Sequence, residues 1–279
     1  GKRPVKYAES DTKYTDLSYD GNGLLTGIMQ VQNFEIWGGA VATNVYSREM
    51  TRDGDRILSE KVTNIDGTLL TNEVKNIKYC YDADGICGMF VDGSQYFFRR
   101  NIFGDVTEIY DKNGVKKAEY AYDAWGTCYL MLDTDGVGSL NPFRYRGYYM
   151  VSCIGLYYLT TRFYDYTTGR FINADVPSIC FDDGLTLPEG CNLYSYCHNN
   201  PISYVDPTGH FAISTLVVII MTTVGVIVGG VYAYDKAYND GARDWELFGW
   251  TLLGAVIGGF IGFGIGRFLG SIASNLGNM

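Results

Sequence analysis

The side chains that most often carry out chemistry are few and scattered in this chain. No two cysteines have the Cys-x-x-Cys spacing of zinc and redox sites, and their number is odd. We therefore expect buried free thiols rather than a disulfide framework, and neither a metal nor a cofactor. The two histidines, His198 and His210, have no serine, cysteine or metal-ligand partner at a recognisable spacing. The seven cysteines are Cys80, Cys87, Cys128, Cys153, Cys180, Cys191 and Cys197.

Arginines stand among aromatic rings between residues 141 and 175. Guanidinium groups stack on rings and pair with carboxylates, and Asp165 and Asp175 are close in sequence. We interpret these arginines as structural groups within a stack of strands, in which Tyr157, Leu159 and Phe163 alternate between two faces. The arginines are Arg144, Arg146, Arg162 and Arg170.

The segment Asp206-Pro207-Thr208-Gly209 fits a type I turn, with Asp, Pro and Gly at the favoured positions. As a turn alone it needs no function. It also marks a change of composition, because residues 211–234 and 247–266 contain no charged side chain.

The elements before this turn read as repeated β-hairpins. Tyr-Asp pairs recur at junctions between a strand and a turn, and most are followed by glycine within four residues. Stacking such hairpins in series would pair their edges and give a curved sheet or shell; an ordinary antiparallel sandwich is the alternative. The pairs are Tyr19-Asp20, Tyr81-Asp82, Tyr110-Asp111, Tyr122-Asp123 and Tyr164-Asp165.

The clearest repeat runs from residue 96 to residue 123 and predicts strand, turn, strand, turn, strand. Lys112-Asn113-Gly114 is its hairpin turn, since Asn-Gly tolerates positive φ. Strict alternation would place one set of side chains on one face and the other set on the opposite face. The first set is Val106, Glu108 and Tyr110, and the second is Thr107 and Ile109.

The net charge of the chain is −9, from 22 basic and 31 acidic residues, so no basic footprint for nucleic acid is present. We therefore expect no nucleic-acid partner. The chain begins at Gly1-Lys2-Arg3 in the middle of its pattern, which indicates a fragment or a processed product.

The region 211–279 predicts two apolar helices joined by a polar linker. Each uncharged run is as long as the roughly 20 residues that span a bilayer core. Glycines recur every fourth residue in the second run, and such a stripe permits close helix packing in a membrane. A helix pair buried within a soluble shell is the alternative. The packing glycines are Gly225, Gly229, Gly254, Gly258, Gly262, Gly266 and Gly270.

The segment 141–210 closely resembles the repeat-associated core of Rhs/YD-repeat proteins, the carriers of bacterial polymorphic toxins used in competition between bacteria. The resemblance covers about 70 residues, and weaker repeats extend it back to about Tyr14. Order, spacing and residue types agree together. The matching residues are Arg144, Arg146, Gly147, Arg162, Tyr164, Asp165, Gly169, Arg170, Phe171, Asn200, Pro201, Pro207 and Gly209.

This resemblance implies a mainly β fold in which stacked antiparallel hairpins form part of a shell, and the apolar runs predict that an α-helical hydrophobic hairpin follows it. Together they divide the chain into repeats at 1–140, the core at 141–210 and two hydrophobic helices, which we expect to span a membrane, at 211–279. The partners implied by the resemblance are an upstream Rhs shell and an immunity protein, and the apolar runs within residues 211–266 predict a lipid bilayer as a further partner. The implied location is secreted or at the cell surface.

Many proteins of this family cut their own chain just after the core, and the resemblance assigns this chemistry to aspartates. The matching positions are Asp175 and Asp206, with the scissile bond near His210-Phe211. The mechanism would resemble an aspartic protease, in which one protonated and one ionised carboxyl activate a water. Asp182 and Asp183 are alternative partners. The chain departs from the family at Asp175-Val176-Pro177, where Asp-Pro is common.

Three functions follow from these residues. The first is a toxin carrier whose tail inserts into or crosses a membrane. The second is a self-cleaving core whose only substrate is its own chain, and the third is a membrane-anchored surface scaffold. The tail itself is either the effector or a linker to another domain.

Overall fold

The computed structural model describes residues 4–36, 39–69, 71–175, 192–209, 213–241, 246–248, 250–253, 255 and 257. The chain forms two compact units, Gly1–Ala174 and Asp175–Met279.

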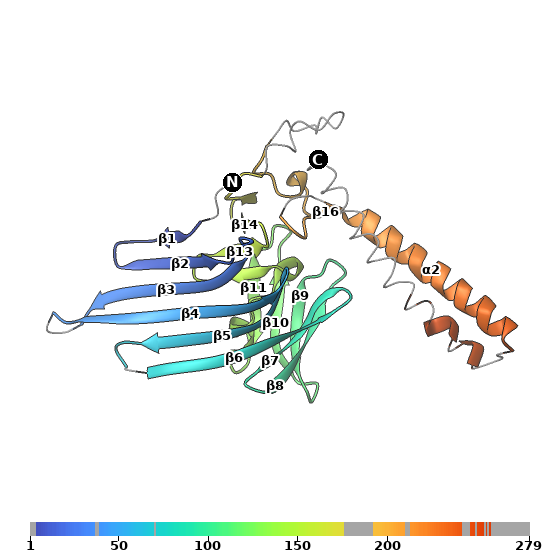
Figure 1. The fold of residues 1–279 in the computed structure, drawn as a ribbon, viewed down its shortest axis with the longest axis horizontal. Coiled ribbons are helices and arrows are strands. Elements are labelled where there is room, and N and C mark those ends of the chain that lie inside the picture. Colours follow the sequence, from blue (N-terminus) through green and yellow to red (C-terminus); the bar gives the residue numbers. More distant parts are fainter. Residues whose placement is uncertain are drawn as a thin grey trace. The chain divides into compact units, whose positions relative to one another are not determined.

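The first unit is built on an antiparallel sheet of eleven strands whose spatial order equals their order in the sequence. Figure 1 shows long strands β3 to β6 lying side by side, with β7 to β10 turned away from them. The mainly β prediction is therefore confirmed, and hairpins joined in series form the sheet. The strands are β1 (Lys6–Ala8), β2 (Lys13–Tyr19), β3 (Leu25–Glu35), β4 (Val41–Asp53), β5 (Arg56–Asp66), β6 (Thr71–Asp82), β7 (Gly85–Val91), β8 (Ser94–Arg100), β9 (Val106–Asp111), β10 (Lys116–Tyr122) and β11 (Cys128–Asp133).

The aspartate of the Tyr-Asp pair organises the turn that follows it. The Asp20 carboxylate accepts hydrogen bonds from the backbone N–H groups of Asn22 and Leu24, at 2.9 and 2.8 Å. Asp111 and Asp123 accept from the corresponding groups two and four residues later. These bonds close a tight turn without help from the neighbouring strands, which is why the dipeptide recurs at hairpin ends.

A β-bulge follows five turns of the large sheet, those after Asp20, Asp53, Asp82, Asn101 and Asp111, and the bulge in β9 corrects the alternation predicted there. Arg99 pairs with Glu108 and Arg100 with Val106, so Thr107 is an extra residue in its strand. As a result Val106 and Ile109, three positions apart, are both fully buried. The prediction that they lie on opposite faces was wrong, because a bulge resets the pleat. The extra residues after the other four turns are Thr26, Leu58, Cys87 and Lys117.

The residue before the aspartate contacts the bulge of the preceding repeat. The hydroxyl of Tyr81 donates to the carbonyl of Ile57 at 2.8 Å, and that of Tyr122 donates to the carbonyl of Val106 at 2.6 Å. Arg52 occupies the same position in its hairpin, and its Nε donates to the carbonyl of Leu25 at 2.6 Å. Each acceptor lies immediately before a bulged residue, where the ladder of backbone bonds is disrupted. The repeat is therefore held together by side chains at the places where the sheet bonds are irregular.

A second, four-stranded sheet packs against the first within the same unit. Its strands share one hydrophobic core with residues of the large sheet, such as Leu25, Ile77 and Ile109. Strand β13 is buried at all four positions, which means that both of its faces are covered. The strands are β12 (Tyr149–Val151), β13 (Leu156–Leu159), β14 (Arg162–Asp165) and β15 (Arg170–Phe171), and the short helix α1 (Val137–Leu140) and a 3₁₀ turn (Tyr145–Gly147) lead into them.

The second unit contains a small hairpin and helices. Strands β16 (Tyr204–Val205) and β17 (Ile213–Ser214) pair with each other, and helix α2 (Thr215–Asn239) follows directly. The described residues between Glu246 and Ile257 are also helical, and a Cβ on Gly230 of α2 would lie 3.4 Å from the Cβ of Ala255. The described part of the predicted tail is thus mostly helical.

The predicted membrane insertion of this tail finds no support in the described residues. Among them, no helix is both long and apolar enough to cross a membrane. Gly225 and Gly229 lie in α2, as predicted. Of the packing stripe in the second run, Gly254, Gly258, Gly262, Gly266 and Gly270 lie outside the described residues.

Candidate functional site

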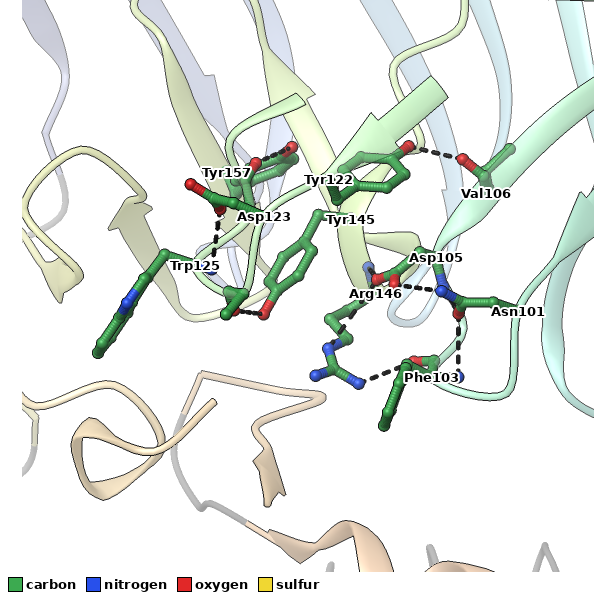
Figure 2. Close-up of polar contacts among 12 residues, drawn as sticks. Asn101, Phe103, Asp105, Val106, Tyr122, Asp123, Trp125, Tyr145, Arg146 and Tyr157 are labelled. Atoms are coloured by element: carbon green, nitrogen blue, oxygen red, sulfur yellow. Dashed lines mark hydrogen bonds and ion pairs between the residues drawn. The ribbon is translucent and has the colours of Figure 1, made fainter. Parts of the chain in front are cut away.

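One cluster of specific polar contacts lies where the turn between β10 and β11 meets the four-stranded sheet. Three consecutive carbonyls of this turn, those of Ala124, Trp125 and Gly126, each accept a hydrogen bond from a tyrosine hydroxyl. The donors are Tyr145 at 2.7 Å, Tyr164 at 2.7 Å and Tyr157 at 2.9 Å. Figure 2 shows this turn with Asp123, Trp125, Tyr145 and Tyr157. The tyrosines of the core segment therefore bind the backbone of a turn in the repeats.

Two glycines provide the space that these contacts need. Gly126 has a φ of +98° and lies against the Tyr145 ring, where a Cβ would come within 2.7 Å. Gly169 has a φ of +67° and faces Trp125, whose ring would lie 2.9 Å from a Cβ. Only glycine satisfies both the left-handed backbone and the space available. The predicted core residue Gly169 is thus explained by Trp125, which the sequence interpretation did not select.

Arg146 forms a second contact between the core motif and the repeats. Its backbone N–H donates to Oδ1 of Asp105 at 2.7 Å, and its Nε lies 3.9 Å from the same oxygen. The guanidinium stacks over the rings of Phe103 and Tyr145, with centroids at 4.5 and 5.2 Å. Asn101 donates to Oδ2 of Asp105 at 2.6 Å, which fixes the carboxylate (Figure 2). The ring contacts predicted for Arg146 are present, and its carboxylate partner Asp105 comes from the repeats.

Two of the other three predicted arginines lie against aromatic rings. The Arg144 guanidinium lies 5.7 Å from the Tyr120 ring centroid, and that of Arg162 lies 3.6 Å from the Phe171 centroid. Arg162 is buried, whereas Arg170 is exposed and pairs through its backbone with Asp165. Asp165 itself accepts hydrogen bonds from Thr167 and Thr168. Gly147 has a φ of +68° in the turn after Arg146.

A buried charge cluster, which the sequence interpretation missed, joins the two sheets. Arg48 of β4 and Glu60 of β5 form an ion pair at 2.6 Å, and the Glu60 side chain is 0% exposed. Tyr79 of β6 and Tyr149 of β12 donate to the two Glu60 oxygens at 2.7 and 2.6 Å. Arg48 also donates to the carbonyl of Leu140 at 2.6 Å. Burial raises the pKa of both Tyr79 and Tyr149 far above the usual range, and the nearby Glu60 charge adds to this effect.

The two candidate catalytic aspartates both belong to the second unit and are both buried. Asp206 is 2% exposed, and its Oδ1 accepts from the backbone N–H groups of Thr208 and Gly209 at 3.3 and 2.8 Å. Gly209 has a φ of +81°. Asp175 is 7% exposed, and its backbone N–H donates to the carbonyl of Leu193. The predicted scissile bond, His210-Phe211, and the alternatives Asp182 and Asp183 lie outside the described residues.

A left-handed turn precedes the predicted pair Asn200-Pro201. Cys197, His198 and Asn199 have φ values of 49°, 51° and 60°. Such a run is costly for residues with a Cβ, roughly 1–2 kcal/mol each. The buried Cys197 and the packing of the His198 ring against Tyr204, with centroids 5.4 Å apart, accompany it. The Asn200 side chain then accepts from the N–H of Ser203 at 3.2 Å.

The described residues hold no group of three or more His, Cys, Asp or Glu side chains that could bind a metal ion. The five described cysteines, Cys80, Cys87, Cys128, Cys153 and Cys197, are free thiols, but only Cys197 is buried, so the prediction of buried thiols was wrong for the other four. The polar contacts of the first unit, in which tyrosine hydroxyls and arginines bind carbonyls and carboxylates, position one sheet against another. In the second unit, the Asp206 turn places a carboxylate beside the backbone of residues 208 and 209.

Comparisons with known proteins identify relatives that match part of the chain. No family model matches the chain. Over 171 residues it is 33% identical to the tRNA3(Ser)-specific nuclease WapA of Bacillus spizizenii, a match that covers 57% of this chain and 7% of that protein. Over 68 residues it is 43% identical to double-stranded DNA deaminase toxin A of Burkholderia cenocepacia, covering 24% of this chain and 4% of that protein. The chain thus spans less than a tenth of the length of either relative.

The fold has a counterpart in a solved structure. The crystal structure of TcdB2-TccC3-TEV matches with a TM-score of 0.56 at 19% identity, over 72% of this chain and 9% of that chain. At this identity the likeness concerns the fold alone. The chain is therefore similar, over part of its length, to two toxin-related bacterial proteins, and it has the fold of a segment of TcdB2-TccC3.

Proposed function

We propose that this chain is a segment of an Rhs-type toxin carrier. Its repeats form part of the wall of a β-shell, and its core closes the end of that shell. The observation that carries this proposal is the joint between the two sheets of the first unit. Hairpin repeats build a sheet in sequence order, and the four-stranded sheet of the core packs on it through buried tyrosines and the Arg48–Glu60 pair. A sheet built in this way is suited to enclosing or presenting another part of the polypeptide.

The two relatives support this role because the activities for which they are named differ. One is named for cleaving a specific tRNA and the other for deaminating double-stranded DNA, yet both match this chain. A segment shared by proteins of different activity does not by itself set either activity, so a common carrying role accounts for it. The first unit has the contacts of a scaffold, in agreement with this inference.

A segment exchange tests the proposal. The matched 171 residues of WapA would be replaced by those of this chain, and cleavage of tRNA3(Ser) and of other tRNAs would be measured. A carrier segment sets no substrate, so the chimera should keep the original tRNA specificity. A chimera that folds by circular dichroism but cleaves a different tRNA would overturn the proposal. A chimera carrying Glu60→Leu, which breaks the joint between the sheets, serves as the control for misfolding.

We also propose that the second unit cleaves its own chain shortly after Gly209. The supporting observation is the buried Asp206 carboxylate, which accepts hydrogen bonds from the backbone of Thr208 and Gly209. Asp175 is the second carboxyl of the proposed pair, in the same unit. One protonated and one ionised carboxyl would activate a water against the peptide bond, as in an aspartic protease.

Chain length on a denaturing gel tests this cleavage. Native protein should yield a fragment ending near residue 210, and Asp206→Asn should stay full length. Because Asn keeps a side-chain oxygen that can accept from the Thr208 and Gly209 N–H groups, it preserves the turn while removing the acid. Wild-type chain that stays intact under native conditions would contradict the proposal.

The predicted lipid partner of residues 211–279 is a separate proposal, supported by the uncharged runs of the sequence. Release of dye from liposomes by the full chain, compared with a chain ending at Gly209, measures it. A passive anchor or a helix pair used only for packing releases no dye.

A further inference from the structure

Two cysteines meet at one of the bulges of the large sheet. Cys80 of β6 pairs with Gly88 of β7, and Tyr81 pairs with Ile86, which leaves Cys87 as the extra residue. At a bulge, two residues of one strand oppose a single residue of the other. Cys87 and Gly88 therefore both stand opposite Cys80.

The equivalent bulge of β8 and β9 shows where the side chain of the extra residue points. There Thr107 is the extra residue and Arg99 is opposite, and the Thr107 hydroxyl donates to the Arg99 carbonyl at 3.2 Å. The extra side chain thus reaches the backbone of the opposing residue. If the bulge of β6 and β7 has the same geometry, the Cys87 side chain lies beside Cys80.

Both thiols lie away from the core and have room to approach each other. Cys80 and Cys87 are half-buried, whereas their neighbours Tyr79 and Ile86 are core residues. Gly88 contributes no side chain between them, and a Cβ there would lie 2.6 Å from the Tyr96 carbonyl, so only glycine fits. Opposing Cβ atoms in a sheet are about 4.5–5.5 Å apart. A disulfide needs about 3.5–4.5 Å, which is a movement of about 1 Å.

We propose that Cys80 and Cys87 are a redox-active pair that forms a cross-strand disulfide by exchange with a small-molecule disulfide such as oxidised glutathione. One cysteine thiolate attacks a glutathione sulfur, forms a mixed disulfide and releases one glutathione thiol. The second cysteine thiolate attacks the protein-bound sulfur, forms the Cys80–Cys87 bond and releases the other glutathione thiol. The two protein sulfurs are oxidised and the two glutathione sulfurs are reduced.

The local charges set the pH dependence of this exchange. Burial, the Asp82 carboxylate and Cys80 raise the pKa of the Cys87 thiol, while Arg100, which is paired with Asp82 at 2.6 Å, opposes them. The attacking species is the thiolate. Exchange is therefore slow at neutral pH and accelerates as the pH rises, so the pair responds to a sustained oxidising environment.

Mass spectrometry of a tryptic peptide tests the proposal directly. Cleavage after Lys78 and Arg99 gives the peptide Tyr79–Arg99, which contains Cys80 and Cys87 and no other cysteine. The full chain is equilibrated in a glutathione redox buffer at pH 8, either native or in urea, then alkylated with iodoacetamide and digested. The internally linked peptide carries no alkyl group and is two hydrogens lighter than the reduced form. We expect the equilibrium constant for this link to be about tenfold higher in the native chain than in urea.

Variants show whether the link depends on the geometry of the bulge or only on the reactivity of the thiols. Cys80→Ser should leave Cys87 as a mixed disulfide with glutathione, whereas Cys153→Ser should not change the link. The bulge at Ser18 and Thr26 has the same pattern, with Gly27 opposite Ser18. Ser18→Cys with Thr26→Cys, in a chain carrying Cys80→Ser and Cys87→Ser, should also cross-link in the native state.

Two results would overturn the proposal. The first is that Cys80 and Cys87 link no more readily in the native chain than in urea. This result counts against the proposal whether or not the Ser18→Cys/Thr26→Cys chain forms its link. The second is a native chain in which both cysteines end as glutathione adducts. Either outcome would mean that the bulge does not bring these two thiols together.

Discussion

Single tyrosine hydroxyl groups link the repeats at the β-bulges of the large sheet. The Tyr122 hydroxyl donates to the Val106 carbonyl beside a bulge, and its ring is largely enclosed. Tyr122→Phe leaves this carbonyl without its donor, and we expect a loss of about 1–2 kcal/mol in the free energy of unfolding. Urea denaturation followed by circular dichroism measures it. Tyr110→Phe is the matched control, because the Tyr110 hydroxyl contacts Glu108 in an accessible ion-pair network and should cost less. Equal losses would show that the bulge carbonyl needs no donor.

Two glycines with similar backbone conformations allow the cost of backbone strain to be measured separately from the cost of a steric clash. Gly114 has a φ of +77°, and a Cβ added there would have no neighbour within 4 Å, whereas a Cβ on Gly126 would collide with the Tyr145 ring. Gly114→Ala should cost about 1 kcal/mol through backbone strain alone. Gly126→Ala should cost roughly 1–3 kcal/mol more, because the ring must move. Thermal unfolding of the two variants compares them, and a Gly126→Ala chain as stable as Gly114→Ala would mean that the Tyr145 contact is loose.

At the scale of elements, the joint between the two sheets depends on one buried ion pair. Glu60→Leu leaves Arg48 charged and buried without its carboxylate, and we expect a loss of about 3–5 kcal/mol. Adding Arg48→Met to the same chain should cost much less than it does in the wild type, because the partner is already gone. The four urea denaturation curves form a double-mutant cycle. Additive losses would show that Arg48 and Glu60 do not act as a pair.

The hairpins could be predicted from the sequence, but their faces could not. Tyr-Asp pairs followed by glycine identify turns, because the aspartate closes the turn through local bonds alone. Bulges such as the one at Thr107 depend on pairing with another strand, and no local pattern revealed them. The pairs Arg52-Asp53 and Arg100-Asn101 occupy the same register as Tyr-Asp, yet their residue types hid them from a search for one dipeptide.

The candidate site was predictable only where it is local. Asp206 and Gly209 are three residues apart, and the Asp206 carboxylate accepts hydrogen bonds from the backbone N–H groups of Thr208 and Gly209. The contacts of Arg146 with the Tyr145 ring and of Arg162 with the Phe171 ring, both within the core segment, were also expected. Asp105, Glu60 and Trp125 were missed because their partners lie tens of residues away in the chain. The proximity of such residues is set by the packing of the two sheets.

At the scale of the whole molecule, buried tyrosine hydroxyls make stability depend on alkaline pH. Burial raises the pKa of Tyr79, Tyr81, Tyr120, Tyr122, Tyr149 and Tyr157 in the folded chain. In the unfolded chain tyrosine titrates near 10. Above about pH 10 the unfolded chain therefore binds fewer protons than the folded one, and the free energy of unfolding falls as the pH rises. The stabilisation is fully present below this pH.

Each such tyrosine contributes a slope of about 1.4 kcal/mol per pH unit above pH 10, so the combined loss is steep. Urea denaturation at intervals between pH 8 and pH 11 measures the slope. Tyr79→Phe removes one titrating hydroxyl and should flatten the slope by about one such step, although it lowers stability at pH 8. Met89→Leu, which perturbs the same core without a tyrosine, should lower the curve and leave its slope unchanged. A Tyr79→Phe slope equal to that of the wild type would mean that the folded chain lets this hydroxyl ionise as freely as the unfolded chain does. In that case the sheets would be joined loosely enough to admit water around Glu60, and the joint could not serve as the rigid closure that a carrier requires.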